Sequence, residues 1–367
     1  MSLLAFMLLI LSASSMVWAA PLEEIRQILR VKAFKPPAEA QLAALSDENL
    51  QQTLLEMDTY ARYFDADEYR SLMSLRQSWV GIGADLLEQG GSFFLAVYQG
   101  GAAERAGLVD RSRLLDIDGK PVADASVQSI AERLKGAEGT SVTLVVEKPG
   151  GEKATIQVER EVFSPLDVES VGPGERPILR IRRFIGGLTR PALLATLDFF
   201  SSKPKAVSSS AQEALIIDLR DAGGGDLYES FDVAGLYLPP GTLLGTMCRR
   251  GNDNLEIRVP SGEKYTMPLA LLVGPDTASA AEVFAGILQQ HGRAKLIGQR
   301  TYGKCTTQTD AHLSDGSVLR YTNGEVRLPD GSSCSGVGLQ PDREVANEVF
   351  GKISLLMEAV DELFLKQ

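Results

Sequence analysis

The pattern of apolar and polar positions divides the chain into stretches of different character. Residues 20–76 are rich in Leu, Glu, Gln and Arg, with Leu50, Leu54 and Leu55 at helical spacing, which predicts a small helical region. Residues 77–162 contain short β-type runs such as 93–98 and 141–147, separated by glycine-containing turns, and one helical stretch at 127–134. We therefore expect a compact β module after the helices.

A third pattern begins at residue 163 and alternates strands with helices. An apolar strand at 178–181 precedes a helical segment at 193–200, and two buried-looking strands follow at 214–219 and 269–273. This alternation predicts an α/β core over 163–345. The tail, 346–367, has apolar residues at helical spacing and predicts a C-terminal helix. The fold class expected is thus α/β (α+β) and multidomain.

The first 19 residues have the pattern of a secretory signal peptide. An apolar run from Leu3 to Leu11 is followed by small residues and by Val17, Trp18 and Ala19, which fit a cleavage site after Ala19. The run has no Lys or Arg before it, and 3–20 is just long enough to span a bilayer, so an uncleaved anchor is the alternative. Either reading predicts a periplasmic or secreted protein.

Charge and cysteine content remove several classes of function. The 37 Lys and Arg against 48 Asp and Glu give a net charge of −11, which argues against a nucleic-acid partner. The three cysteines, Cys248, Cys305 and Cys334, are too few and too scattered for a disulfide-built fold or a zinc site. We expect no metal and no cofactor.

Candidate chemistry follows the predicted strands, because sites in open α/β sheets form at the carboxyl ends of strands. After 214–219 come three consecutive glycines, 223–225, which favour either a structural turn or a site where backbone N–H groups face an anion. After 269–273 comes Ser279, at the expected start of a helix. A helix N-cap explains most serines there, but the helix dipole and the N–H of Ala280 would also suit a nucleophile with an oxyanion site.

Lys304 is the candidate base. It follows Tyr302 and Gly303 in the segment 301–308, and a single Lys beside Gly is commonly a solvated charge. The chain has two histidines, His291 and His312, and neither lies in a recognisable triad pattern. A serine hydrolase would therefore need a lysine whose pKa falls from about 10.4 to about 7–8 by burial.

The segment 275–308 resembles the signature of the carboxyl-terminal processing (tail-specific) serine peptidases. In that family the serine and the lysine are 25 residues apart and a glutamine lies four residues beyond the lysine, as Ser279, Lys304 and Gln308 do here. The resemblance implies that Ser279 is the nucleophile, Lys304 the base and Gln308 the residue that orients the base. It also implies a ClpP/crotonase-like protease core.

The same resemblance covers most of the chain after residue 57. The segment 219–225 is similar to the Leu-Arg-Asn-Asn-Pro-Gly-Gly loop of the family, which implies an oxyanion hole made by Gly224 or Gly225 together with Ala280. The β module resembles a PDZ domain, in which Gly81, Ile82 and Gly83 would bind a peptide carboxylate. Arg113 either contacts that carboxylate or is solvated.

The chain departs from the family pattern at a few positions. Asp221 and Ala222 replace two asparagines, and Gly223 replaces the proline. Cys305 stands beside the lysine where the family has glycine; we favour a small buried side chain there, with a disulfide to Cys334 or Cys248 as the alternative.

The function expected is a serine endopeptidase that recognises apolar C-terminal tails of proteins through its PDZ domain. One alternative is a catalytically silent PDZ protein that binds protein C-termini, and another is a serine hydrolase that uses His291 or His312. By resemblance, movement of the PDZ domain would gate the site, an adaptor protein would be a further partner, and the terminal helices would form a homodimer contact. Simple coverage of the core by these helices is the other reading.

Overall fold

The structure is a computed structural model that describes residues 20–77, 80–98, 100–162, 168–171, 178–202, 214–260 and 265–364. The predicted signal peptide, residues 1–19, lies outside these residues. Internal contacts divide the chain into a smaller unit, made of residues up to 70 together with 308–322, and a larger unit, made of 71–307 and 323–367. In the described part of the chain, no helix combines the length and the apolar character needed to cross a bilayer.

The smaller unit contains the helices expected near the N-terminus. Its elements are α1 (Leu22–Lys32), α2 (Glu39–Ala43), α3 (Leu50–Met57) and β1 (Arg62–Phe64), with α4 (Ala66–Gln77) continuing beyond it. The apolar faces of the helices are buried together, and Leu319 and Tyr321 join this core from β18 (Val318–Arg327). β1 pairs antiparallel with β18. Residues 308–322, which the sequence pattern groups with the α/β core, thus cluster with the N-terminal helices.

The β module of the larger unit has its own hydrophobic core and a five-stranded antiparallel sheet with one short extra strand. Its elements are β2 (Val80–Gly81), β3 (Ala84–Gln89), β4 (Ser92–Val97), α5 (Ala102–Arg105), β5 (Ser112–Ile117), β6 (Lys120–Pro121), α6 (Val127–Leu134), β7 (Ser141–Glu147), β8 (Lys153–Glu159) and β9 (Glu161–Val162). The order β3-β4-β5-β7-β8 leaves β3 at an edge. Ser126 caps α6. Every second residue of β7, namely Val142, Leu144 and Val146, points into the core.

The α/β core is built on a second sheet, in the order β10-β11-β12-β15-β16-β19. The strands are β10 (Val168–Val171), β11 (Ile178–Ile181), β12 (Leu215–Asp218), β15 (Leu269–Val273), β16 (Ala294–Gly298) and β19 (Arg343–Glu344). All neighbours from β11 onward are parallel. The predicted strands at 178–181, 214–219 and 269–273 are confirmed, and each is buried on both faces, as parallel strands are.

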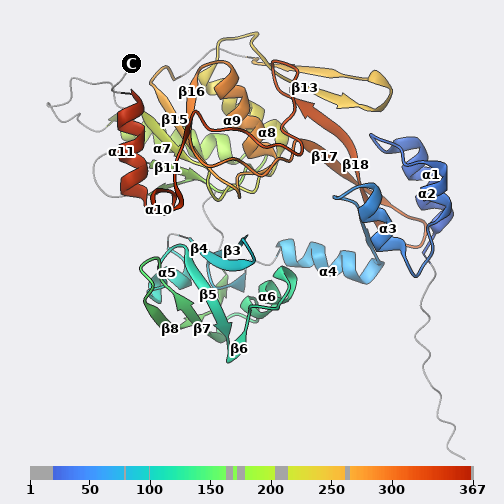
Figure 1. Cartoon of the computed structure of the whole chain (residues 1–367), viewed down its shortest axis with the longest axis horizontal. Helices are drawn as coiled ribbons and strands as arrows, with labels where there is room; N and C mark the ends of the chain where they lie inside the picture. The colour runs from blue at the N-terminus through green and yellow to red at the C-terminus, as the bar shows by residue number, and fades with distance from the viewer. Residues whose placement is uncertain are drawn as a thin grey trace, which may run out of the picture. The chain divides into compact units, whose positions relative to one another are not determined.

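Helices cover both faces of this sheet (Figure 1). They are α7 (Thr189–Ser202), α8 (Leu227–Ala234), α9 (Ala280–Gln290), α10 (Asn347–Phe350) and α11 (Ile353–Phe364). A 3-10 turn at Gly235–Tyr237 follows α8, and another at Arg250–Asn252 joins β13 (Leu243–Arg249) to β14 (Leu255–Arg258). Successive residues of β12 alternate between the faces, because Ile217 packs with α8 and α9 whereas Ile216 packs with α11. The core is thus a sheet that is parallel from β11 onward, covered by helices on both faces, with loops at the carboxyl ends of its strands.

The remaining strands form a separate antiparallel ribbon. β13 (Leu243–Arg249) pairs with β14 (Leu255–Arg258) and with the end of β18, and β17 (Thr306–His312) also pairs with β18. β17 and β18 begin in one unit and end in the other. The chain therefore leaves the larger unit just after the predicted base, Lys304, and returns at residue 323.

Candidate active site

Three loops meet at the carboxyl ends of β12, β15 and β16, and Thr277 ties them together. Its Oγ1 donates to the Leu219 carbonyl at 2.8 Å, and its own carbonyl accepts from the Tyr302 amide at 3.1 Å. The Ala278 amide donates to the Ala222 carbonyl at 2.9 Å. The three segments singled out in the sequence are therefore neighbours in space, as the topology of a parallel sheet predicts.

Ser279 is the N-cap residue of α9, as the sequence predicts. Its φ of 57° and ψ of −124° are unusual for a residue with a side chain and mark a sharp turn between the loop after β15 and the helix. The side chain is half-buried, so the hydroxyl is sheltered without being sealed. At the start of an 11-residue helix it also lies at the positive end of the helix dipole.

The glycine loop after β12 approaches Ser279 closely. A Cβ added to Gly224, whose φ is +105°, would lie 2.7 Å from the Ser279 Cβ and 3.1 Å from the Ala280 nitrogen. Phe184 holds this loop, since its amide donates to the Gly224 carbonyl at 2.9 Å and its carbonyl accepts from the Asp226 amide at 2.7 Å. Glycine is required at position 224 because any side chain would collide with the predicted nucleophile.

Glu282, one turn into α9, links the loops of Ser279 and Lys304. This carboxylate is fully buried, and its Oε2 accepts from the Ser279 amide at 3.0 Å and from the Lys304 amide at 2.7 Å. Its Oε1 accepts from the Gly303 amide at 2.7 Å and from the Thr301 hydroxyl at 2.5 Å. One oxygen atom thus fixes the backbone nitrogens of the two predicted catalytic residues near each other.

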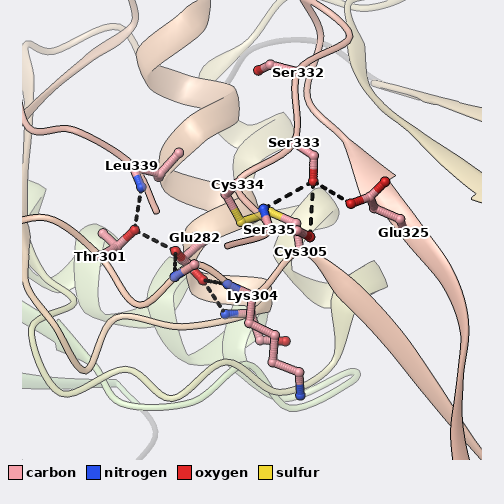
Figure 2. Close-up of a disulfide and its surroundings, with 12 residues drawn as sticks. Glu282, Thr301, Lys304, Cys305, Glu325, Ser332, Ser333, Cys334, Ser335 and Leu339 are labelled. Carbon is pink, nitrogen blue, oxygen red and sulfur yellow. Dashed lines mark hydrogen bonds between the residues drawn. A yellow bond between two sulfur atoms is a disulfide. The ribbon is translucent and has the colours of Figure 1, made fainter. Parts of the chain in front are cut away.

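Lys304 is half-buried, and its side chain extends from the loop away from the neighbouring disulfide (Figure 2). Of the alternatives for Cys305, the structure has the disulfide to Cys334, in addition to the expected burial; Cys248 is a buried free thiol. Gln308 belongs to the smaller unit, where its amide donates to Thr322 at 3.3 Å. Its predicted role as the residue that orients the base stays a prediction.

A second buried carboxylate, Asp218, is the last residue of β12. It binds Arg220, in the segment that leads to the three glycines. Arg220 donates to it from Nε at 2.9 Å and from Nη2 at 2.8 Å, and Arg180 donates from Nη2 at 3.1 Å. Burial alone would raise the pKa of Asp218, but the two guanidinium groups outweigh burial and hold this pKa well below its usual range. Arg220 also donates to the Phe350 carbonyl at 2.6 Å, which secures the loop to α10.

The β module contacts two of the site loops within the larger unit. Arg111 forms an ion pair with Asp221, two residues before the first of the three glycines, and the side chain of Asp221 is 1% exposed. Gln89 of β3 donates to Asp276, in the loop after β15, at 2.6 Å. Burial raises the pKa of the Asp276 carboxyl above its ordinary value, and the negative charge of Asp221 adds to this rise.

The predicted peptide-binding turn of the β module is tightly packed. Ile82 is buried, and its carbonyl accepts from the Ala103 amide at 2.7 Å. A Cβ on Gly83, whose φ is +74°, would lie 3.0 Å from the backbone of Gly101, so glycine is required there. Arg113 forms an ion pair with Glu147 at 2.7 Å, which occupies its guanidinium in this structure.

The two histidines occupy other positions. His291 follows the last residue of α9, and its Nε2 lies 2.8 Å from the Leu243 carbonyl. Because a helix rises about 1.5 Å per residue, His291 is about 18 Å from Ser279 along α9. His312 lies on β17 in the smaller unit, with its ring against Tyr69. In the described ranges there is no group of acidic, His and Cys side chains suited to a metal ion.

Sequence reasoning missed the two buried carboxylates. The spacing of Ser279 and Glu282 is that of a capping box, which would have identified one of the hydrogen bonds of Glu282. Its other donors lie about twenty residues further along, so the link to Lys304 is visible only in the fold. For Asp218 the Arg220 partner is two residues away, whereas Arg180 comes from the neighbouring strand β11.

Comparison with known proteins gives matches to two domain families. Residues 178–345 match Peptidase family S41 and residues 93–148 match the PDZ domain. The chain is 26% identical over 340 residues to the "Probable CtpA-like serine protease" of Staphylococcus aureus and 28% identical over 307 residues to that of Staphylococcus haemolyticus. These alignments cover 91% and 82% of this chain, but 66% and 59% of the length of the relatives.

A solved structure titled photosystem II D1 C-terminal processing protease has the same fold, with a TM-score of 0.59 and 23% identity, covering 92% of this chain and 90% of that one. The expected fold, a PDZ domain joined to an α/β protease core, is confirmed. Residues 178–345 are thus similar to peptidases of family S41 and residues 93–148 to a PDZ domain, and the chain has the fold of a solved C-terminal processing protease.

Proposed function

We propose that this chain is a serine endopeptidase of the cell envelope that binds apolar C-terminal tails through its PDZ domain and cleaves protein substrates. Ser279 is the nucleophile and Lys304 is the general base. The observation that carries this proposal is the Glu282 carboxylate, whose single Oε2 receives the backbone amides of both residues. A purely structural N-cap serine would not need a link to the lysine loop.

The reaction begins when the Ser279 Oγ attacks the scissile carbonyl carbon and the neutral Lys304 amine accepts the hydroxyl proton. The negative charge on the carbonyl oxygen is stabilised by N–H groups of Ala280 and of Gly224 or Gly225. The Lys304 ammonium then protonates the leaving amine, and an ester to Ser279 remains. Water, deprotonated by Lys304, hydrolyses this ester and restores the serine. Gln308 orients the lysine, as the family resemblance implies.

The PDZ domain supplies the binding energy for the substrate tail. Its strand β3 is an edge strand, and helix α6 contacts β3, so an extended peptide can add as a further strand beside this helix. Gly81, Ile82 and Gly83, just before β3, are the proposed carboxylate-binding turn. Because Arg111 and Gln89 contact the site loops, occupation of the PDZ groove can gate the glycine loop through Asp221.

Export by residues 1–19, a homodimer contact through the terminal helices and an adaptor protein complete the proposal. They rest on the sequence pattern and on the family resemblance. Size measurement of the purified chain in solution tests the dimer. Sequencing of the mature N-terminus tests cleavage after Ala19 and separates a signal peptide from a membrane anchor.

Hydrolysis of an unfolded protein and of a peptide with an apolar C-terminus tests the mechanism. Ser279→Ala and Lys304→Ala are expected to lose activity by about 10⁴-fold or more while staying folded. His291→Ala and His312→Ala are the matched controls and are expected to retain activity. Activity lost in a histidine variant but kept in Lys304→Ala would contradict the dyad, and tail peptide that is bound but never cut would favour a silent binding protein.

A further inference from the structure

The loop that carries Lys304 is held on its two sides by different means. On the N-terminal side, Glu282 binds the amides of Gly303 and Lys304. On the C-terminal side, the very next residue is Cys305, which is bonded to Cys334 (Figure 2). No residue separates the proposed base from this covalent link.

The segment that supplies Cys334 lies directly against the lysine loop. The Gly336 amide donates to the Gly303 carbonyl at 2.9 Å, and the Leu339 amide donates to the Thr301 hydroxyl at 2.7 Å. A Cβ on Gly303 would lie 3.0 Å from the Gly338 nitrogen, which shows how closely the two backbones approach. Segment 334–339 thus packs against the loop that carries Lys304, and the disulfide joins the two segments covalently.

The position of this disulfide along the chain gives it a particular task. Its cysteines are 29 residues apart, and the chain between them leaves the larger unit after Thr307 and returns at Asn323. Cys305 therefore lies just before the chain departs, and Cys334 lies after it has returned. The disulfide therefore anchors the Lys304 loop to another segment of the larger unit, independently of residues 308–322, which belong to the smaller unit.

We propose that the Cys305–Cys334 disulfide is a positioning element for Lys304 and that the peptidase reaches full activity only once these two thiols have been oxidised. This inference rests on the proposed Ser279/Lys304 mechanism. The two thiols lose two electrons and two protons to the disulfide of an oxidant, such as oxidised glutathione or a disulfide oxidoreductase. The disulfide of the oxidant is reduced to two thiols as the protein S–S bond forms.

Because the disulfide is buried, its oxidation is a single activation step, and the bond is not reduced and re-formed quickly. Both cysteines are 2% exposed, so a reductant thiolate reaches the sulfur atoms only when the region opens locally. The third cysteine, Cys248, is buried in β13 and is free, which provides a matched control within the same chain.

The test compares the full chain with Cys305→Ala/Cys334→Ala and with Cys248→Ala. Because small displacements of a reacting group cost about 100-fold in rate, we expect the double variant to lose kcat by about 10- to 100-fold with KM close to that of the wild type. Hydrogen exchange at the Gly303 and Lys304 amides is expected to accelerate in the double variant. In Cys248→Ala, we expect kcat and the hydrogen exchange of the Gly303 and Lys304 amides to stay at the wild-type values.

Reduction of the folded Cys248→Ala protein with dithiothreitol removes any concern that the double variant misfolds. We expect kcat to fall as the two thiols appear and to return on reoxidation with oxidised glutathione, a rescue that the double variant cannot show. Unchanged kcat and unchanged exchange at Gly303 and Lys304 after full reduction would overturn the proposal, as would a change confined to KM.

Exchange also separates this proposal from the proposed function. If the oxidised wild type shows no hydrolysis that depends on Ser279, the proposed function fails. Faster exchange at Gly303 and Lys304 on reduction would still show that the disulfide holds the loop, and unchanged exchange would show that it does not.

Discussion

Asp218 and Glu282 are both fully buried carboxylates that support loops of the same site, yet their surroundings are opposite. Asp218 is matched by the charges of Arg180 and Arg220. The hydrogen bonds to Glu282 come from three backbone amides and one hydroxyl, and none of these donors is charged. Asp218 thus balances charge under the glycine loop, whereas Glu282 fixes the backbone of Ser279 relative to that of Lys304.

The largest expected effect comes from removing the charge of Asp218. Asp218→Asn removes the counter-charge of buried Arg220 and one of the two carboxylates that pair with buried Arg180, the other being Asp110. We expect the free energy of unfolding to fall by about 3–5 kcal/mol. Urea unfolding followed by fluorescence measures this. Asp310→Asn is the control, because its ion pair with Arg320 is partly exposed and is expected to contribute about 1 kcal/mol or less.

Removing the charge of Glu282 is expected to harm catalysis more than stability. In Glu282→Gln, an NH₂ group replaces a carboxylate oxygen, so a hydrogen-bond donor faces the N–H or O–H donors that the oxygen accepted from. The Ser279 and Lys304 loops then shift apart, and we expect kcat to fall by about 100-fold. The loss of stability is expected to be about 1–3 kcal/mol.

Glu229→Gln provides the matched control for Glu282→Gln. Glu229 is also buried and also accepts from backbone amides, two in its case, from Gly187 at 2.8 Å and from Arg190 at 2.6 Å. We expect a similar loss of stability with a much smaller loss of kcat. Equal losses of kcat in the two variants would remove the distinction between Glu282 and an ordinary structural carboxylate.

Acid tests the contribution of the Asp218 ion pairs without mutation. The pKa of Asp218 is held well below the unfolded value of about 3.9, so its ion pairs contribute fully above about pH 4. This contribution declines as the pH falls below 3.9 towards the folded pKa, by about 2–3 kcal/mol near pH 2. Unfolding free energies measured from pH 5 to pH 2 test this. An equally steep acid loss in Asp218→Asn would show that other groups cause it.

The smallest expected effect is at the opposite end of α9. His291→Ala removes the contact of the imidazole with the Leu243 carbonyl and leaves the Ser279 end of the helix unchanged. We expect kcat/KM to stay at the wild-type value over the whole pH range. A pH profile that loses a limb near the ordinary histidine pKa of about 6.5 would instead return a histidine to the mechanism.

Much of this arrangement is predictable from local sequence signals. The runs of apolar residues predict β12 and β15, and the strand and helix at 141–147 and 127–134 are found at those bounds. The placement of Ser279 at the start of α9 follows from the polar-to-apolar change at 279–283. These features depend on periodicity and on helix termini, which the sequence carries within a few residues.

The connections between distant segments are not predictable in this way. The pairing of Cys305 with one of two other cysteines, the four donors of Glu282 and the Arg180 partner of Asp218 all depend on which loops meet in three dimensions. The grouping of 308–322 with the N-terminal helices is a further case, since these residues share a core through Leu319 and Tyr321.

The most direct test of the account is to trap the acyl-enzyme. The wild-type protein would be mixed with an activated ester of an apolar amino acid, quenched in acid, and analysed by intact mass and by peptide mapping. We expect one added acyl group on Ser279, absent in Ser279→Ala and formed far more slowly in Lys304→Ala and Glu282→Gln. An acyl group on another residue, or the same labelling in Ser279→Ala, would contradict it.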